Sequence, residues 1–307
     1  MPELPLSTGF RTELPFFRDP GQLPCPLPTS EEIRAGTIVP TKRECYPGDY
    51  GHVAIVGEHF VVKYGRYIRE NEGHTLLFLE KYPSVPAPRL YAMYRKDDIL
   101  YLVMQLISGI DLLKLWDELS KNEKVSICEQ LRRIFSQLRA IPAPSPSYFG
   151  SISGGPVEHR FFKWMDEDPR MNGPFKTLED FHLGMAYHSQ KQEELNDRHP
   201  WVSEWFARHL PQALKDHPCT FSHSDLVRQN IMVQEQPGSD GSTERHFKVT
   251  IIDWETAGWF PRYWEYGAFF VDCLWEGDWE SMVETWLDPC PLEGALLKLF
   301  KHSVDGY

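Results

Sequence analysis

Residues 221–233 read FSHSDLVRQNIMV, and this stretch decides the fold. An apolar strand start leads into His223-Ser224-Asp225, and Asn230 follows five residues after the aspartate. Residues 249–255, VTIIDWE, form a second apolar run that ends on Asp253, 23 residues after the asparagine. An aspartate in a tight turn and an asparagine five residues later can face one point in space, so these side chains are candidates for a single site.

The residue types in this pattern suit phosphoryl transfer. One carboxylate must accept or orient the proton of the attacking hydroxyl, while an amide oxygen and a second carboxylate hold magnesium on the phosphates. We therefore expect Asp225 to be the catalytic base, with His223 in the same catalytic loop, and Asn230 and Asp253 to be metal ligands. Taken singly, Asp225 could be a turn former and Asn230 a hydrogen-bonded loop amide, but the combined spacing favours the catalytic interpretation.

Composition excludes some partners. The formal net charge of the 307 residues is -12, and a phosphate backbone demands a basic face, so nucleic acid is not expected as the main partner. A few local cations and a metal can still hold a nucleotide. The acidic balance either favours a cationic small substrate by electrostatic steering or serves solubility alone.

The six cysteines are scattered, without a C-x-x-C pair, which indicates free thiols in a reducing compartment. The first residues, MPELP, lack the basic start and apolar run of a signal peptide. No stretch approaches the roughly 18 apolar residues of a membrane span. We expect a cytoplasmic protein without a membrane partner, and the sequence leaves its oligomeric state open.

Local patterns divide the chain into three parts. Residues 1–44 hold a proline-rich arm and a short helix, which opens on the capping box Thr29–Glu32 and ends near Gly36. Residues 45–107 predict a five-stranded antiparallel sheet with a hairpin at Gly57-Glu58 and one amphipathic helix over 69–81. Residues 108–307 are mainly helical, with a few short strands and a polar hairpin tip at 236–245. The order predicts a two-lobed α+β fold with a cleft between a small sheet lobe and a larger helical lobe.

The catalytic stretches resemble the motifs of the aminoglycoside phosphotransferase/choline kinase-like family, a branch of the protein-kinase-like fold. The common family form is His-Gly-Asp-Leu-x-x-x-Asn followed by Ile-Asp-Trp-Glu, and this chain has Ser224 where glycine is common. Residues 254–266, WETAGWFPRYWEY, extend the match and are similar to the version in many fungal members. The resemblance covers nearly the whole chain from about residue 45. It implies ATP and Mg²⁺ as cofactors and a small hydroxylated acceptor.

The N-terminal half also resembles the family. Residues 61–65, VVKYG, look like the strand whose lysine, here Lys63, contacts the α and β phosphates. Residues 72–79 look like the helix whose glutamate, here Glu72, anchors that lysine, and Glu70 is the competing partner. A lysine held by a helical carboxylate is a fixed cation for phosphate, whereas Lys63 by itself could be a solvated edge-strand lysine.

Two further segments complete the implied nucleotide site. Residues 101–109, YLVMQLISG, resemble the strand and hinge whose backbone seats adenine, which implicates Gln105 and Ile107. Residues 46–52 lie where the family has its phosphate loop and carry Gly48 and Gly51. Glu265 could accept hydrogen bonds from the catalytic-loop amides or simply stabilise a helix N-terminus.

The acceptor is not readable from the sequence. Four acids, Asp272, Glu276, Asp278 and Glu280, could bind an amine or form a solvated helix face. A catalytically silent nucleotide-binding scaffold is the alternative to a small-molecule kinase, and the complete set of catalytic residue types argues against it. A protein kinase is not expected, because Asp-Trp-Glu follows the second strand and no Ala-Pro-Glu segment comes after Asp253.

Overall fold

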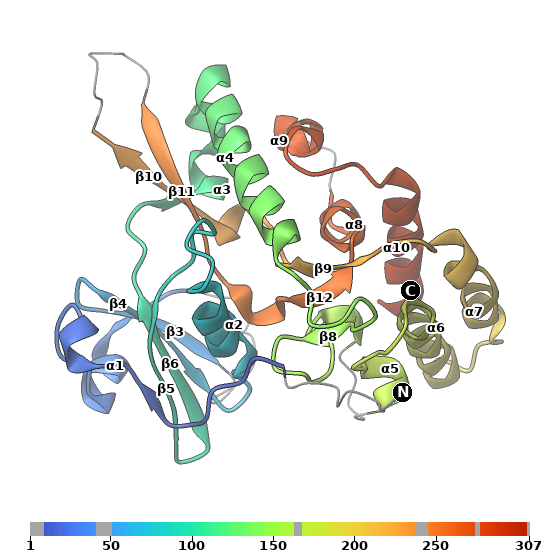
Figure 1. Cartoon of the computed structure of the whole chain (residues 1–307), viewed down its shortest axis with the longest axis horizontal. Helices are drawn as coiled ribbons and strands as arrows, with labels where there is room; N and C mark the ends of the chain where they lie inside the picture. The colour runs from blue at the N-terminus through green and yellow to red at the C-terminus, as the bar shows by residue number, and fades with distance from the viewer. Residues whose placement is uncertain (1–8, 41–50, 163–167, 238–244, 274–276, 306–307) are drawn as a thin grey trace.

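The computed structural model describes residues 9–40, 51–162, 168–237, 245–273 and 277–305, and in Figure 1 they form a sheet-rich lobe and a larger helical lobe. This arrangement confirms the expected two-lobed α+β architecture. The strands of the small lobe are β1 (Phe16–Phe17), β2 (Thr37–Ile38), β3 (His52–Val56), β4 (Phe60–Gly65), β5 (Leu90–Lys96) and β6 (Ile99–Gln105).

The small-lobe sheet has six antiparallel strands in the order β1-β5-β6-β4-β3-β2, not the five expected from residues 45–107. Four described strands come from that range, and the proline-rich arm supplies an edge strand on each side. The arm strands are two residues long, so they carry no alternating pattern that a sequence could reveal. The expected hairpin is present, with Gly57 at φ 61°, a conformation that favours glycine.

The arm also covers the outer face of this sheet. It holds the 3₁₀ turn η1 (Pro20–Gln22) and helix α1 (Ser30–Ala35), which begins at the expected Thr29–Glu32 capping box. Ile33 of α1 is fully buried against outward-facing side chains such as Ala54 and Val62. The arm is therefore built into the small lobe.

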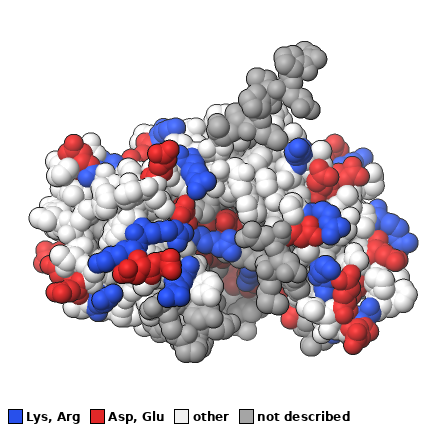
Figure 2. Space-filling model, turned by 90° about the horizontal axis from the view of Figure 1, so that it is seen from below, with Lys and Arg blue, Asp and Glu red and all other residues white. Residues whose placement is uncertain are grey.

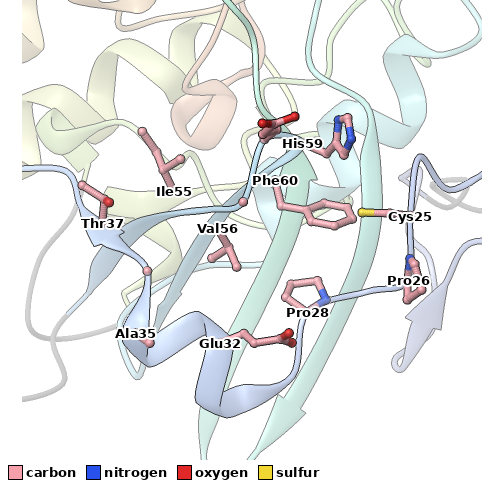
Figure 3. A pocket seen from close by; sticks show the side chains of 13 residues that line it. Cys25, Pro26, Pro28, Glu32, Ala35, Thr37, Ile55, Val56, His59 and Phe60 are labelled. Atoms are coloured by element: carbon pink, nitrogen blue, oxygen red, sulfur yellow. The ribbon is translucent and has the colours of Figure 1, made fainter.

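A hollow of about 430 Å³ opens on this outer side, between α1 and the β3–β4 hairpin (Figure 3). Its lining includes Glu32, Thr37, His59 and Phe60, and the ring of Phe60 points toward the free thiol of Cys25. None of the residues expected to bind nucleotide or metal lines this hollow.

Helix α2 (Asn71–Leu79) lies on the other face of the sheet, at the position expected from residues 69–81. Eight of its nine residues are buried, so the prediction that it is amphipathic was wrong. The reason is that α2 has neighbours on several sides: the sheet at Met93, the large lobe at Phe221, and the N-terminal end of the chain at Phe10.

We call residues Gly9–Arg18 the N-terminal strap, because they run along α2 before entering the sheet at β1. The ring of Phe10 lies 5.7 Å from that of Phe78, and the Lys81 ammonium lies 4.4 Å above Phe10. The backbone amide of Thr12 donates to His74 Nδ1 at 3.3 Å. At its start the strap approaches the large lobe so closely that a Cβ on Gly9 would lie 2.0 Å from the amide of Gly154.

The large lobe consists of helices around two small sheets. The helices are α3 (Leu112–Leu115), α4 (Lys121–Ala140), α5 (Pro169–Asn172), α6 (Leu178–Leu195), α7 (Trp201–Ala213), α8 (Trp264–Val271), α9 (Asp278–Met282) and α10 (Pro291–Val304). The 3₁₀ turns are η3 (Trp116–Glu118), η4 (Arg160–Phe162), η5 (Arg228–Asn230), η6 (Trp254–Thr256) and η7 (Val283–Thr285). No helix in the described part of the chain is long and apolar enough to cross a membrane.

The two small sheets have the orders β11-β10-β7 and β8-β12-β9. Their strands are β7 (Ile110–Asp111), β8 (Gly150–Ser151), β9 (Cys219–Ser222), β10 (Ile231–Gln236), β11 (His246–Ile251) and β12 (Gly258–Pro261). β10 and β11 form the expected antiparallel pair out to Gln236 and His246, and most of the expected hairpin tip lies outside the described residues.

The largest apolar core crosses the boundary between the lobes. Leu76 and Phe78 of α2 belong to the same buried cluster as Phe221, Trp254 and Trp259 of the large lobe. The Phe78 ring lies 5.5 Å from Phe221 and 6.3 Å from Trp259. The C-terminal end of α2 is thus fixed to the large lobe by aromatic packing.

We expect Phe10→Ala to lower the free energy of unfolding by about 1–3 kcal/mol, because it removes a half-buried ring that joins the strap to α2. Urea denaturation would measure the loss. Phe17→Ala is the matched aromatic truncation in the same arm, at a side chain that is 54% exposed, and it should cost less than half as much. Equal losses would contradict the inference that Phe10 anchors the strap.

Candidate active site

Lys63 stands at the meeting point of the two lobes. Its Nζ lies 2.7 Å from Glu72 Oε2 of α2 and 2.5 Å from Asp253 Oδ1 of the large lobe. The predicted pairing with Glu72 is present, while the competing Glu70 pairs with Arg95 instead at 3.0 Å. Burial by itself would lower the pKa of Lys63, but the carboxylates of Asp253 and Glu72 more than reverse this effect and raise it. Lys63 is therefore a fixed, fully charged cation.

The catalytic loop leaves β9 and turns sharply at Ser224, whose φ is 73°. This left-handed conformation costs a serine more than a glycine. Ser224 Oγ accepts a hydrogen bond of 3.0 Å from Trp264 Nε1, which fixes the side chain in this turn. The residue after this turn, Asp225, is partly exposed, whereas the residues from β9 to Ser224 are mostly buried.

Glu265, near the start of α8, stabilises the backbone turn at Ser224. Its carboxylate accepts hydrogen bonds from the backbone amides of His223 at 2.8 Å and Ser224 at 3.3 Å. Burial raises the pKa of Glu265 to about 7, although these amides act in the opposite direction. Both interpretations drawn from the sequence apply, since Glu265 is a first-turn acid and also receives the catalytic-loop amides.

His223 is fully buried, and its ring contacts backbone atoms. Nε2 donates to the carbonyl of Ile252 at 3.0 Å, and Nδ1 accepts from the amide of Asp225 at 3.3 Å. Burial lowers the pKa of His223 to about 4, so the ring is neutral at pH 7. These contacts place His223 between the catalytic loop and the strand end before Asp253, where it holds both segments, and the ring has no open face for proton transfer.

Asn230, in η5, is tied to the same loop. Its Nδ2 donates to the carbonyl of Asp225 at 2.9 Å and approaches Asp225 Oδ2 at 3.5 Å. The amide nitrogen is therefore used within the loop, and Oδ1 is the atom that can serve as an external ligand.

Asp225 is a partly buried acid in an acidic neighbourhood. Burial raises its pKa to about 6, and the carboxylates of Asp253 and Glu255 add to the shift, while Arg160 opposes it. Above pH 7 the side chain is mostly ionised. It therefore has the properties of a general base that functions near neutral pH.

Three carboxylates gather around the Lys63 ammonium. Oxygens of Glu72, Asp253 and Glu255 lie within 4.8 Å of one another. The backbone of Asp253 adopts the left-handed conformation, with φ 65°, and its side chain is about one-third exposed. Burial raises the pKa of Glu72 to about 7, and the three carboxyl groups together offer the oxygen donors that a cation would need.

The hinge after β6 has an open backbone amide at Ile107. The amide of Gln105 donates to Arg89, and that of Leu106 donates to His59. Within the described part of the chain the amide of Ile107 makes no hydrogen bond, so it, and not the amide of Gln105, is available for a ligand. Gly51 is buried directly before β3, whereas Gly48 lies outside the described residues.

Two of the four acids considered as amine ligands, Asp272 and Asp278, are paired with other side chains. Asp272 Oδ2 lies 2.5 Å from Arg160 and Oδ1 lies 3.6 Å from Lys301. Asp278 accepts hydrogen bonds from Trp116 Nε1 at 2.6 Å and from Lys124 at 2.8 Å. Of the other two, Glu276 lies outside the described residues and Glu280 belongs to α9.

Two residues that the sequence did not single out make hydrogen bonds behind the site: Asn71 links the two lobes, and Thr256 links two segments of the large lobe. Asn71, next to Glu72, donates to the carbonyls of Glu255 and Ala257, and Thr256 donates to the carbonyl of His223. Their only sequence signal is adjacency, to Glu72 in one case and to the Asp-Trp-Glu run in the other.

Seen from below, the molecule is hollowed near its middle, with acidic and basic side chains inside the hollow (Figure 2).

Comparison with known proteins agrees with this geometry. A family model described as "Phosphotransferase enzyme family" matches residues 65–288, well over half of the chain. No curated protein matches the sequence.

Several solved structures have a similar fold. The GDP complex of wild-type aminoglycoside 2'-phosphotransferase-IIIa has a TM-score of 0.54 and 16% identity, over 84% of this chain and 82% of that one. A putative fructosamine-3-kinase from Haemophilus somnus 129PT has a TM-score of 0.52 and 14% identity, over 83% of this chain and 80% of that one. The streptomycin–ATP–APH(2'')-IIa ternary complex has a TM-score of 0.52 and 14% identity, over 88% of this chain and 84% of that one. At these identities the likeness shows the kinase-like fold alone, and it confirms that expectation.

We expect Asp225→Asn to stabilise the fold above pH 6. The folded-state pKa of about 6 exceeds the ordinary value of 3.8, so ionised Asp225 destabilises the native state above pH 6 and this penalty fades as the pH falls. Thermal denaturation at pH 8 should show a rise in Tm of about 2 °C or more, shrinking toward pH 5.

Asp168→Asn provides a control of opposite sign. Hydrogen bonds from Arg170 lower the pKa of Asp168 to about 2, so the substitution should lower Tm at pH 8. A Tm for Asp225→Asn at or below wild type at pH 8 would contradict the burial of its charge.

Proposed function

This chain belongs to the phosphotransferase enzyme family, and we propose that it transfers a phosphoryl group from ATP to a hydroxyl of a small molecule. One observation carries the proposal: Lys63, held by Glu72 in the small lobe, meets Asp253 of the large lobe. Beside this point lies the strained loop that presents Asp225. Positioning and charge neutralisation are the main requirements of phosphoryl transfer, and this arrangement supplies groups for both.

ATP would lie against the inner side of the small-lobe sheet. The free amide of Ile107 suits a hydrogen bond to the base, and Lys63 suits the phosphates because both its position and its charge are fixed. Gly51 precedes β3 at the end of the segment proposed to cover the phosphates. One similar structure contains GDP and another ATP, so GTP belongs beside ATP in the first binding experiment.

The donor set fits Mg²⁺, which prefers oxygen ligands. Asp253 and the amide oxygen of Asn230 would hold the ion, and Glu255 adds a carboxylate to the same group. A bound magnesium ion would neutralise phosphate charge and fix the phosphate geometry. The excess of carboxylates over ammonium at this point supports a cation without any rearrangement of the fold.

Asp225 would orient the acceptor hydroxyl and take its proton. The loop around it is held by Asn230, by Glu265 and by the neutral ring of His223. We therefore assign Asp225 the catalytic role, and we assign His223 a positioning role in place of the catalytic one expected from the sequence.

We propose that the acceptor approaches past Arg160 and Asp272, an ion pair whose charges both act on the pKa of Asp225. Because the Asp272 carboxylate is already paired with Arg160 and Lys301, it is not a free anchor for an amine. We propose a hydroxylated small molecule as the acceptor, with aminoglycoside-, choline- and metabolite-like compounds as the classes to test.

Incubation with ATP, Mg²⁺ and a panel of neutral, cationic and anionic hydroxylated compounds tests the function directly. We expect phosphate transfer to at least one class. Asp225→Ala should abolish this transfer while nucleotide binding survives, because a positioned base contributes about 10²–10⁴-fold. If Asp225→Ala kept more than about a tenth of the wild-type rate, Asp225 would not be the base. Binding of Mg·ATP without hydrolysis or transfer would instead indicate a silent scaffold.

Asp253→Ala should weaken Mg·ATP by about tenfold or more and metal-free ATP much less, since the carboxylate acts through the metal. Isothermal titration calorimetry with and without magnesium separates the two affinities. Asp288→Ala is a control at a surface aspartate paired with Arg139 and Arg262, and it should change neither. Equal weakening of both affinities by Asp253→Ala would exclude it as a metal ligand.

A further inference from the structure

Asn71 is the first residue of α2 and the immediate neighbour of Glu72. Its side chain is buried, with 4% of the residue exposed. Nδ2 donates two hydrogen bonds of 2.9 Å, one to the carbonyl of Glu255 and one to that of Ala257. One side-chain amide of the small lobe thus donates two hydrogen bonds to the large-lobe loop just after Asp253.

The gripped loop continues into the catalytic loop. Thr256 lies between the two carbonyls that Asn71 binds, and its Oγ1 donates to the carbonyl of His223 at 3.0 Å. His223 in turn bonds to Ile252 and to the amide of Asp225. Hydrogen bonds, joined by the short backbone segment 255–257, therefore connect the helix of Glu72 to the backbone of Asp225.

The chemistry of the contact requires an amide nitrogen. Both partners are carbonyl oxygens, so the opposite orientation of the amide would place three oxygens together, and an aspartate could not donate at all. Asn71 Oδ1 is buried and has no hydrogen-bond partner among the described residues. An unpaired buried acceptor is costly, so packing alone does not account for an asparagine here.

Asn71 fixes the N-terminal end of α2, which carries Glu72. The far end of the helix is fixed to the large lobe by Phe78, which packs on Phe221 and Trp259. Near Glu72, by contrast, the polar links to the large lobe among the described residues are the Asn71 bonds, the Lys63–Asp253 contact and the half-exposed Arg69–Glu158 ion pair. Of these links only the Asn71 bonds come from a buried side chain of α2 itself, so loss of Asn71 would loosen the end that carries Glu72 and leave the rest of the helix docked.

We propose that Asn71 is a positioning residue, which sets the small-lobe pair Lys63–Glu72 at the correct distance from Asp253 and Asp225. The inference rests on the proposed function, because the groups that it aligns are those assigned to phosphoryl transfer. It extends that function by naming the contact through which the two lobes share one geometry.

The test compares Asn71→Ala and the isosteric Asn71→Asp with wild type. Calorimetry should show Mg·ATP binding weakened about tenfold or more, but metal-free ATP weakened less than about threefold, since only the metal joins the nucleotide to the displaced loop. In the free protein, hydrogen exchange at residues 223–225 and 253–257 should quicken about tenfold or more, while β5 and β6 keep wild-type protection.

Asn196→Ala is the matched control. Asn196 also donates its side-chain amide to a backbone carbonyl, that of Gln192 at 2.7 Å, but it lies at the end of α6. It should leave nucleotide affinity and exchange in the site segments unchanged. Thr256→Val removes the next link and keeps the shape, so the double variant with Asn71→Ala should lose less than the product of the two single effects.

The outcomes separate this inference from the proposed function. Unchanged exchange in residues 223–225 and 253–257, or uniform loosening of the sheet as well, would overturn the positioning role of Asn71. So would equal weakening of Mg·ATP and metal-free ATP. A wild-type protein that transfers phosphate to no acceptor would defeat the proposed function alone, because exchange in the free protein still decides the role of Asn71.

Discussion

A buried lysine governs the architecture of this protein. Removing the Lys63 ammonium from water is costly unless carboxylates replace its hydration, and here Glu72 and Asp253 do so from different lobes. The lobes cannot separate without unpairing this charge. Glu255 then makes the cluster acidic overall, so the same packing that satisfies the lysine leaves an excess negative charge at the cleft. One electrostatic constraint thus joins the lobes and gathers the carboxylates proposed to hold a cation.

The large lobe supports this arrangement with backbone that is itself strained. Ser224 and Asp253 both have a left-handed backbone conformation. Each lies two residues after the end of a strand, Ser224 after β9 and Asp253 after β11. Such conformations persist only where the surroundings hold them. Glu265 binds the amides around Ser224, and His223 joins that turn to the residue before Asp253. These buried polar groups thus hold the two turns that carry Asp225 and Asp253.

Sequence patterns predicted the parts of this design that depend on local chemistry. The Thr29 capping box, the Gly57 hairpin and the Lys63–Glu72 pair follow from spacing or from motif, and the structure contains them. The assignment of Asp225, Asn230 and Asp253 to catalysis and metal binding remains a prediction that the geometry supports. Of the two hinge residues proposed for the adenine contact, Gln105 has its amide bonded to Arg89 and Ile107 does not, a difference that depends on tertiary pairing and not on the local sequence.

Other parts left no readable signal. The arm enters the sheet through strands of two residues, which are too short for alternation. The partners of Asn71 are backbone carbonyls 184 and 186 residues away, and every residue type has a carbonyl. His223 belongs to a catalytic motif, but its role depends on which atoms its buried ring reaches. These features are set by tertiary contacts and not by side-chain periodicity.

Helix α2 shows why the polar contacts matter more than its apolar ones. A helix with one apolar stripe is oriented by burying that stripe, but α2 is buried on nearly every side, so hydrophobic burial gives little preference for one rotation about its axis. Directional bonds must then fix it. Glu72 points to Lys63, Asn71 grips the loop after Asp253, and His74 accepts from the strap on another side. Because the three bonds leave α2 in different directions and reach three separate segments, a rotation that satisfied one would break the others. The orientation of Glu72 is thus determined by the polar residues of the helix, and it depends on the N-terminal strap as well as on the two lobes.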